Sequence, residues 1–349
     1  MMTSMERVLS AISHKEPDRV PLMLLLSLYG AKERQMKPKD YFSSPVNIIK
    51  TQLFMRHKYR NDCLYTFTYA AAEIEAFGGE VIFYDDGPPN SGEPVIKRYE
   101  QIDSLKVPDI KECKSLKNVL EATEGLKKVV GDSVPIIGVV MSPYSLPVMQ
   151  MGFEKYIELI YSMPEMYRKL MSINTEFCVS WANAQLEAGA TAIGYFDPLA
   201  SPEIIDRNTY IKSGYPVDCS AISRIKGATA THLASGAVLP VLEDIIATKT
   251  AMLGVGPKED IGAIKKAAGK RIALLGNLNG IDMLSWSEAD AVKQVKTTIE
   301  KAGRGGGLLL SDCHGEIPYQ VPEDVLMAIS ESVSQIGTYP LKLAGDCNG

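Results

Sequence analysis

Residues 189–198 read GATAIGYFDP, and this stretch contains the pattern from which the fold can be predicted. A glycine precedes a short apolar run, and the run ends at Asp197, which is followed by a proline. The preceding stretch, residues 166–187, has apolar side chains at near-helical spacing. A short apolar run without strict alternation is typical of a strand that is buried on both faces of a parallel sheet. We therefore predict a helix followed by such a strand.

The same pattern recurs along the chain. The eight apolar runs cover residues 19–26, 80–85, 134–140, 191–197, 228–234, 251–256, 271–277 and 306–312. Helical patterns separate the later runs, at residues 153–163, 166–187, 241–249, 260–268, 287–302 and 322–336. No GxGxxG motif follows the first run, which disfavours an open, doubly wound nucleotide-binding sheet. Eight alternating units predict an α/β fold, a (β/α)₈ TIM barrel.

The N-terminal half is longer than eight simple units need. Residues 30–79 and 86–133 lie between predicted strands, and we expect them to form helical or irregular excursions. No Pro- or Ser-rich linker interrupts the chain. We therefore expect residues 1–349 to form a single barrel domain with an elaborated N-terminal half.

Composition excludes several classes of protein. Of the 349 residues, 46% are hydrophobic and 23% are charged, which is too apolar for a disordered chain. A formal net charge of -5 gives no electrostatic basis for binding nucleic acid or an anionic membrane. The N-terminus lacks the apolar core of a signal peptide, and no run approaches the roughly 18 residues that span a bilayer. We expect a cytoplasmic protein; its oligomeric state stays open.

The cysteines are scattered. They are Cys63, Cys113, Cys178, Cys219, Cys313 and Cys347, and no two form a CxxC pair. This spacing indicates neither a disulfide scaffold nor a zinc ribbon.

Polar side chains stand at the ends of five predicted strands. They are Asp85, Asp197, His232, Asn277 and Asp312. In a parallel barrel these ends meet on one face, where chemistry collects. Each residue could instead cap a helix or form a turn, but together they predict a site for a flat, hydrogen-bonding heterocycle.

Metal binding is a separate question. His232 and Cys313 are acceptable zinc ligands by type, and His314 follows directly. The residue two positions after His232, which would face the same way on a strand, is Ala234. One ligand pair without partners does not predict a metal site.

Four segments resemble the uroporphyrinogen decarboxylase superfamily. They read ERVLSAISHKEPDRVP (6–21), AGATAIGYFDPLAS (188–201), GKRIALLGNLN (269–279) and GGLLLSDCHGEIPYQVPEDVLMAI (306–329). The resemblance runs from about Glu6 to Ile336 and implies a single (β/α)₈ barrel. The chain is more similar to the corrinoid-dependent methyltransferase branch, which exchanges a methyl group with a cobalamin on a separate corrinoid protein.

Departures from the family pattern separate the branches. The decarboxylases have an Arg-rich segment just after the first strand, whereas residues 24–35 here read LLLSLYGAKERQ, with no arginine before Arg34. Binding an octa-acid without clustered cations would bury uncompensated charge, so we do not expect decarboxylation. The thiol-methylating branch holds zinc with a His-x-Cys pair and a later Cys. This chain keeps His232 and Cys313 but has Ala234 in place of the first Cys.

The missing ligand suggests the methyl acceptor. Zinc serves to convert a thiol into a bound thiolate, whereas a neutral secondary amine already has its lone pair available. The sequence therefore resembles the zinc-independent methylcobalamin:tetrahydrofolate methyltransferases of glycine betaine demethylation. The resemblance implies methyl transfer from methylcob(III)alamin on a partner corrinoid protein to N5 of tetrahydrofolate.

We assign roles on that basis. His232, Asp312, Cys313 and His314 form the catalytic set, and Asp85, Tyr144, Tyr195, Asp197 and Asn277 form the substrate-binding set, with no metal ligand. For both tyrosines, ordinary packing is the alternative to stacking on the ring. Three other functions stay open: a zinc-dependent thiol methyltransferase of the coenzyme M type, the reverse reaction, and a non-catalytic corrinoid- or tetrapyrrole-binding barrel.

Overall fold

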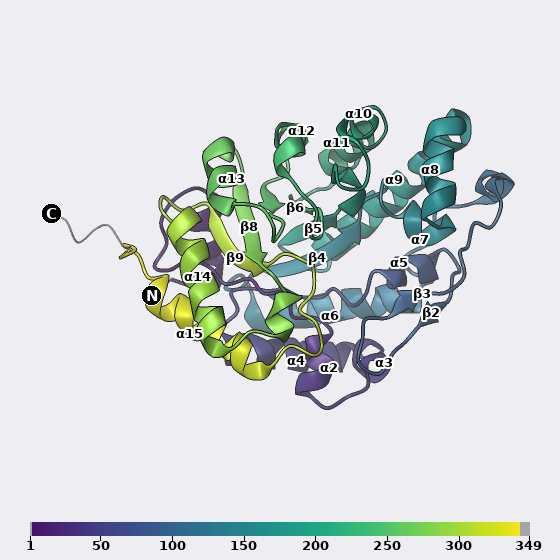
Figure 1. Ribbon diagram of the computed structural model, residues 1–349. Helices are drawn as coiled ribbons and strands as arrows, with labels where there is room; N and C mark the ends of the chain where they lie inside the picture. Colours follow the sequence, from purple (N-terminus) through teal and green to yellow (C-terminus); the bar gives the residue numbers. More distant parts are fainter. Residues whose placement is uncertain (1, 343–349) are drawn as a thin grey trace.

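A computed structural model describes residues 2–342, so Cys347 lies outside the described residues. Seven parallel strands form one curled sheet in the order β1-β4-β5-β6-β7-β8-β9 (Figure 1). Their bounds are β1 (Leu64–Tyr65), β4 (Ile136–Met141), β5 (Ala192–Phe196), β6 (Ala228–His232), β7 (Met252–Gly254), β8 (Ala273–Leu278) and β9 (Leu308–Asp312). Strands that follow one another in this sheet are neighbours in space, as expected of repeated strand–helix units.

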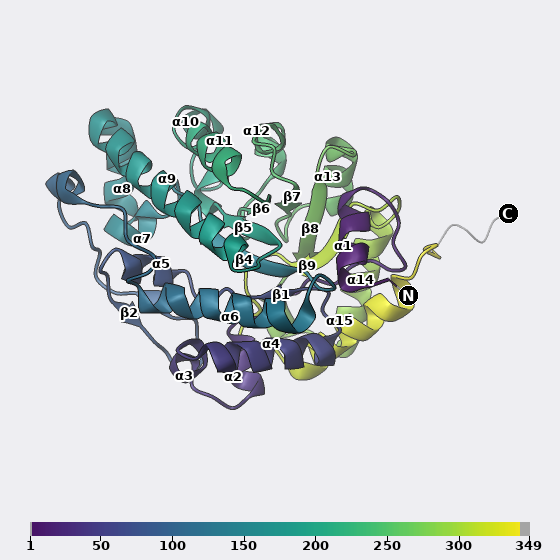
Figure 2. The same ribbon diagram turned by 180° about the vertical axis from the view of Figure 1, so that it is seen from behind.

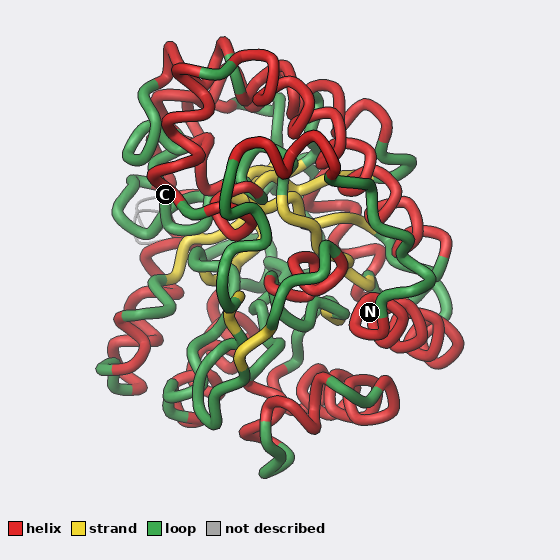
Figure 3. The backbone as a smooth tube through the Cα atoms, turned by 90° about the vertical axis from the view of Figure 1, so that its right-hand side faces the viewer, coloured by secondary structure: helices red, strands yellow, loops and turns green. Residues whose placement is uncertain are grey.

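Most of the helices lie around the outer side of the sheet (Figure 3). The first eight are α1 (Ser4–Ile12), α2 (Tyr29–Glu33), α3 (Pro38–Phe42), α4 (Pro45–Tyr59), α5 (Ala71–Ala76), α6 (Lys114–Val130), α7 (Pro147–Met151) and α8 (Phe153–Ser162). The others are α9 (Pro164–Glu187), α10 (Arg207–Lys212), α11 (Gly214–Arg224), α12 (Leu242–Ala247), α13 (Ile261–Ala268), α14 (Glu288–Ala302) and α15 (Glu323–Ile336). The six helices predicted in the second half are confirmed. Among residues 2–342, no helix is long and apolar enough to cross a membrane.

The first predicted strand, residues 19–26, is extended but not a regular strand. Leu22 forms one parallel bridge with Leu310 of β9. On the same side, Met23 N donates to Leu310 O at 2.8 Å; on the other side, Asp62 N donates to Leu22 O at 2.7 Å. The run therefore bonds to β9 and to the residues just before β1. The described residues form a curled sheet of seven regular strands, where the sequence predicted eight.

The prediction that residues 80–85 form the second strand of the parallel sheet is wrong. β2 (Val81–Ile82) pairs antiparallel with β3 (Asn90–Ser91) in a ribbon outside the curled sheet. The strand next to β4 is β1, inside a stretch expected to be an excursion. The reason lies in burial, because Val81 and Phe83 are half-buried while Ile82 and Tyr84 are exposed. Such alternation is typical of a strand that is exposed on one face.

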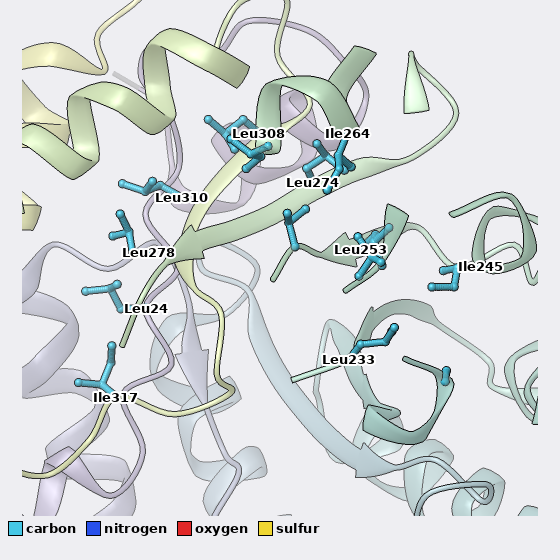
Figure 4. Close-up of a cluster of buried hydrophobic side chains, with 14 of the residues drawn as sticks. Leu24, Leu233, Ile245, Leu253, Ile264, Leu274, Leu278, Leu308, Leu310 and Ile317 are labelled. Atoms are coloured by element: carbon cyan, nitrogen blue, oxygen red, sulfur yellow. The ribbon is translucent and has the colours of Figure 1, made fainter. Parts of the chain in front are cut away.

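The core has two layers, one on each face of the sheet. Leu308 and Leu310 of β9 point outward and pack with Leu253, Leu274 and other apolar side chains beneath the helices (Figure 4). Leu309 points inward and packs with residues that include Met23, Ile137 and Met252. Because both faces are buried, the strands read as continuous apolar runs.

A network of charged side chains closes the end of the sheet where the strands begin. Asp62 is 1% exposed and accepts hydrogen bonds from Arg7 Nη1 at 2.7 Å, Ser4 Oγ at 2.9 Å and Leu22 N at 2.9 Å. Arg19 Nη1 lies 2.8 Å from Asp62 Oδ2, and Arg7 also pairs with Asp18. We call Arg7, Asp18, Arg19 and Asp62 the base network. It joins α1, the first run and the residues just before β1; α1 lies beside β9 (Figure 2).

Candidate active site

The opposite end of the sheet carries most of the predicted polar residues. His232 is the last residue of β6, Asp312 is the last residue of β9, and Asn277 lies near the end of β8. Because all the strands are parallel, these ends meet on one side of the sheet. Cys313 and His314 follow Asp312 directly, and we call His232, Asp312, Cys313 and His314 the strand-end cluster.

His232 is clamped between two neighbouring strands. Its ring stacks on Phe196 of β5, with centroids 4.7 Å apart and an interplanar angle of 24°. On the β7 side lies Gly254, where a Cβ atom would approach within 2.5 Å of His232 Cδ2. The side chain is 2% exposed, yet neither ring nitrogen has a hydrogen-bond partner. Burial lowers the pKa of His232 to about 4, so the imidazole is neutral and its nitrogens can pair with a ligand.

Asp312 has one satisfied and one unsatisfied oxygen. Oδ1 accepts a hydrogen bond from Leu25 N at 2.9 Å, whereas Oδ2 is buried without a partner. Burial raises the pKa of Asp312 to about 6. An unpaired polar atom in the interior is costly, and such atoms cluster where proteins bind ligands or carry out chemistry.

The two residues after Asp312 complete the cluster. Cys313 Sγ donates to Leu278 O at 3.0 Å and lies 3.3 Å from His314 Nδ1. Burial raises the pKa of the Cys313 thiol, so it stays protonated at neutral pH. After burial, the nearby His314 is the second cause of the low pKa of His232, so the two side chains lie near each other.

The loop after Cys313 bends back over the inner face of the sheet. Gly315 has a φ of +97°, and a Cβ atom there would lie 2.3 Å from Phe196 Cε1. Only glycine combines this backbone conformation with so close an approach. Glu316 is half-buried, accepts a hydrogen bond from Leu28 N at 2.5 Å, and burial raises its pKa to about 8.

A small cavity lies inside the sheet below His232. It is lined by apolar side chains and by the small residues Ala192, Gly194 and Ala230, and its volume is about 20 Å³. This is room for one water-sized group. A heterocycle does not fit in this cavity.

The amide nitrogen of Asn277 forms hydrogen bonds with the protein backbone. Nδ2 donates to Gly256 O and to Glu259 O, both at 3.1 Å. These bonds tie the end of β8 to the loop after β7.

Tyr195, Asp197 and Tyr144 lie on the outer side of the sheet, toward the helices. The Tyr195 hydroxyl donates to Asp218 of α11 at 2.8 Å, and the Tyr144 hydroxyl lies 2.9 Å from Ser213 Oγ. Asp197 accepts hydrogen bonds from serine hydroxyls of the loop after β4. Because Phe196 faces inward, its neighbour on the strand, Tyr195, faces outward. Asp197 N donates to His232 O at 2.8 Å, so their backbones are adjacent, but none of the three side chains bonds to the His232 ring.

Asp85 is also separate from the cluster. It is exposed and follows β2 in the antiparallel ribbon. Its assignment to a strand end rested on the strand prediction for residues 80–85, which is wrong.

Three residues near the strand ends were not predicted. Phe67 stacks on Phe196 with centroids 6.4 Å apart, so Phe67, Phe196 and His232 form a row of rings. Glu73 of α5 is buried, and its Oε1 accepts a hydrogen bond from Met141 N at 3.0 Å while Oε2 has no partner. Burial raises the pKa of Glu73 to about 8. Phe196 precedes the strand-end Asp197 and could have been found from strand alternation, but no sequence signal marked Glu73.

The side chains present do not fit the zinc site of the thiol-methylating branch. His232 and Cys313 supply two donors, and Ala234 supplies none. Within residues 2–342, no group of three or more His, Cys, Asp and Glu side chains is arranged to hold a metal ion.

Comparison with known proteins shows the family. The uroporphyrinogen decarboxylase (URO-D) family model matches residues 3–336. The chain belongs to the URO-D family. A URO-D relative, the uroporphyrinogen decarboxylase of Tolumonas auensis, is 23% identical over 342 residues, which cover 91% of this chain and 93% of that protein.

Another relative of this chain is a methyltransferase by its name. The methylcobamide:CoM methyltransferase MtaA of Methanosarcina barkeri is 27% identical over 206 residues, and the match spans 58% of this chain and 60% of MtaA. Among solved structures, a methyltransferase from Methanosarcina mazei superposes with a TM-score of 0.85 at 21% identity, covering 96% of this chain and 99% of that one. The structural likeness supports the URO-D type of α/β fold.

Proposed function

We propose that this protein transfers a methyl group between a corrinoid held by a partner protein and N5 of tetrahydrofolate bound at the strand-end cluster. Similarity to MtaA, a methylcobamide:CoM methyltransferase by its name, supports corrinoid-dependent methyl transfer. The observation that carries the proposal is the strand-end cluster itself, where both His232 nitrogens and Asp312 Oδ2 are buried without partners. In this proposal the chain acts as one barrel, with residues 19–26 in the place of the eighth strand.

The acidic side chains around the strand-end cluster favour a methyl acceptor whose reacting end carries no charge. Within the described chain, no lysine or arginine forms an ion pair with Asp312, Glu316, Glu73, Asp197 or Asp218. A polycarboxylate porphyrinogen or the sulfonate of coenzyme M would meet acids without compensating cations. A pterin ring offers donors and acceptors without a formal charge, and its glutamate tail can extend into solvent.

Cys313 also supports a nitrogen acceptor. Its Sγ donates to Leu278 O at 3.0 Å, and position 234, which would supply a second thiolate to a shared zinc ion, is alanine. An amine nitrogen needs no activation by zinc, because its lone pair is available at neutral pH.

The residues of the cluster then have distinct tasks. Neutral His232 hydrogen bonds to the pterin and holds N5 in line with the methyl carbon. The N5–CH₃ bond forms as the Co–C bond breaks, and the bonding electron pair stays on cobalt as cob(I)alamin. Asp312 Oδ2 accepts the proton that N5 releases, a role that suits a carboxyl group with a pKa of about 6. The reverse reaction would use the same residues in the opposite order.

A direct assay tests the proposal. Purified protein is mixed with free methylcobalamin and tetrahydrofolate, and the spectrum is followed for conversion to cob(I)alamin. We expect turnover with tetrahydrofolate. The proposal fails if tetrahydrofolate gives none and coenzyme M or homocysteine does.

A zinc-dependent thiol methyltransferase is the second candidate, because MtaA, at 27% identity, acts on coenzyme M by its name. It predicts one zinc ion per chain and turnover with coenzyme M. Corrinoid or tetrapyrrole binding without any turnover would indicate the third candidate, a non-catalytic barrel.

A further inference from the structure

Two buried carboxyl groups face one another behind the end of β5. Asp197 follows this strand and is 0% exposed, whereas Asp218 lies on α11 and is 2% exposed. Their side chains lie close enough for each to act on the pKa of the other. Neither carboxyl group is paired with a lysine, arginine or histidine of residues 2–342.

One carboxylate oxygen of the pair receives no hydrogen bond from the surrounding hydroxyl groups. Asp197 Oδ1 accepts from Ser142 Oγ at 2.5 Å and from Ser145 Oγ at 2.6 Å. Asp218 Oδ1 accepts from the Tyr195 hydroxyl at 2.8 Å, and Oδ2 accepts from the Tyr210 hydroxyl at 2.9 Å. Asp197 Oδ2 is buried and receives no hydrogen bond from any of these donors.

No other group near the pair can neutralise it. The titratable side chains that face it are Tyr144 after β4, Tyr156 on α8, Tyr167 and Cys178 on α9, Tyr195 on β5 and Tyr210 on α10, with Cys219 beside Tyr210. Burial raises the pKa of each of these tyrosines and of the Cys178 thiol, so they are neutral at pH 7. Two ionised carboxylates in contact would therefore repel each other in a medium that screens charge poorly.

We propose that Asp197 and Asp218 share one proton, and that this proton locks the loop after β4 onto α11. The proton supplies the hydrogen bond that Asp197 Oδ2 lacks. The Asp197 carboxylate then holds Ser142 and Ser145, and Ser145 Oγ in turn accepts from Leu199 N at 3.0 Å. Asp218 is a positioning residue, because it acts on the strand-end region through Asp197. Burial raises the pKa of both carboxyl groups, which agrees with one retained proton.

The experiment is infrared spectroscopy of the full chain at pH 9, where a protonated carboxyl group has a distinct C=O absorption. At this pH Glu73 and Glu316, with pKa values of about 8, are mostly ionised, so we expect the remaining absorption to come from the pair. Asp218→Asn and Asp197→Asn should each remove it, because the amide supplies the bridging hydrogen in place of the shared proton. The matched control, Glu73→Gln, should keep it.

Thermal unfolding is a second test of the shared proton. The folded pair keeps a proton that an unfolded aspartate releases near its ordinary pKa of 3.8, so the Tm of the wild type should go on falling from pH 8 to pH 10 while the pair still keeps that proton. Either Asn variant should show a shallower fall, which a purely structural role of Asp218 would not produce. The proposal is overturned if the wild type has no carboxylic acid absorption at pH 9, a result that needs no variant to fold. It is equally overturned if the absorption persists in both Asn variants. None of these measurements depends on methyl transfer, so the proposed function can fail independently.

Discussion

The two ends of the curled sheet both bury acidic side chains but treat them differently. At the end where the strands begin, Asp62 is bonded to Arg7, Arg19, Ser4 and a backbone amide. At the end where they finish, Asp312 Oδ2 and both His232 nitrogens have no partner. A fully satisfied network stabilises a fold, whereas unsatisfied buried groups cost stability and persist where a ligand completes them. The base network thus holds the sheet together, and the strand-end cluster is available for chemistry.

The largest effect should come from breaking the base network. Asp62→Ala leaves Arg19 without its carboxylate partner and Arg7 paired with Asp18 alone, which costs about 3–5 kcal/mol of unfolding free energy. Urea unfolding measures the loss. Asp103→Ala is the control, because it breaks an exposed pair with Lys169 and should change the stability little. Equal effects of both substitutions would contradict the assigned role of the base network.

Glu73→Gln tests how the buried Glu73 carboxyl group, near the strand ends, makes the stability of the protein depend on pH. The folded protein keeps the Glu73 proton up to about pH 8, whereas the unfolded chain releases it near 4.5. Stability of the wild type therefore falls as the pH rises from 4.5 to 8, and Gln removes roughly 2–4 kcal/mol of that fall. The measurement is unfolding free energy against pH, with the exposed Glu124→Gln as control. Parallel curves for Glu73→Gln and wild type would show that Glu73 is already ionised in the fold.

Gly254→Ala tests the clamp around His232. The added Cβ would lie 2.5 Å from His232 Cδ2, so the ring has to move at a cost of about 1–3 kcal/mol. We expect methyl transfer to fall at least roughly tenfold, because a small misplacement of a catalytic group is enough for such a loss. Gly194→Ala is the matched control, since its Cβ would approach Val139 no closer than 3.4 Å. Equal activity in the two variants would show that the ring orientation does not matter.

We expect the smallest change in stability from His232→Phe, and this change is an increase. The substitution keeps a ring against Phe196 and removes two buried nitrogens without partners, so unfolding free energy should rise by about 1 kcal/mol. Thermal unfolding compares it with His57→Phe on an exposed face of α4. A loss of several kcal/mol would mean that His232 is bonded in the folded protein.

The sequence was sufficient to predict the strands that end in His232 and Asp312, because apolar runs after periodic helices identify parallel strands and their ends converge. It missed β1, since a strand of two residues leaves almost no pattern. The outward direction of Tyr195 follows from the inward direction of Phe196, but which of the two faces inward is decided by packing against the neighbouring strands. The contact of Asp218 with Asp197 joins a helix to a strand end, and no local pattern records it.

Formation of cob(I)alamin from methylcobalamin and tetrahydrofolate, compared between wild type and His232→Phe, tests most directly whether the strand-end cluster binds the acceptor. We predict turnover by the wild type and a loss of roughly 100-fold in the folded variant, the size expected when one preorganised hydrogen-bonding group is removed. Undiminished turnover in His232→Phe, or wild-type turnover with coenzyme M and none with tetrahydrofolate, would contradict it.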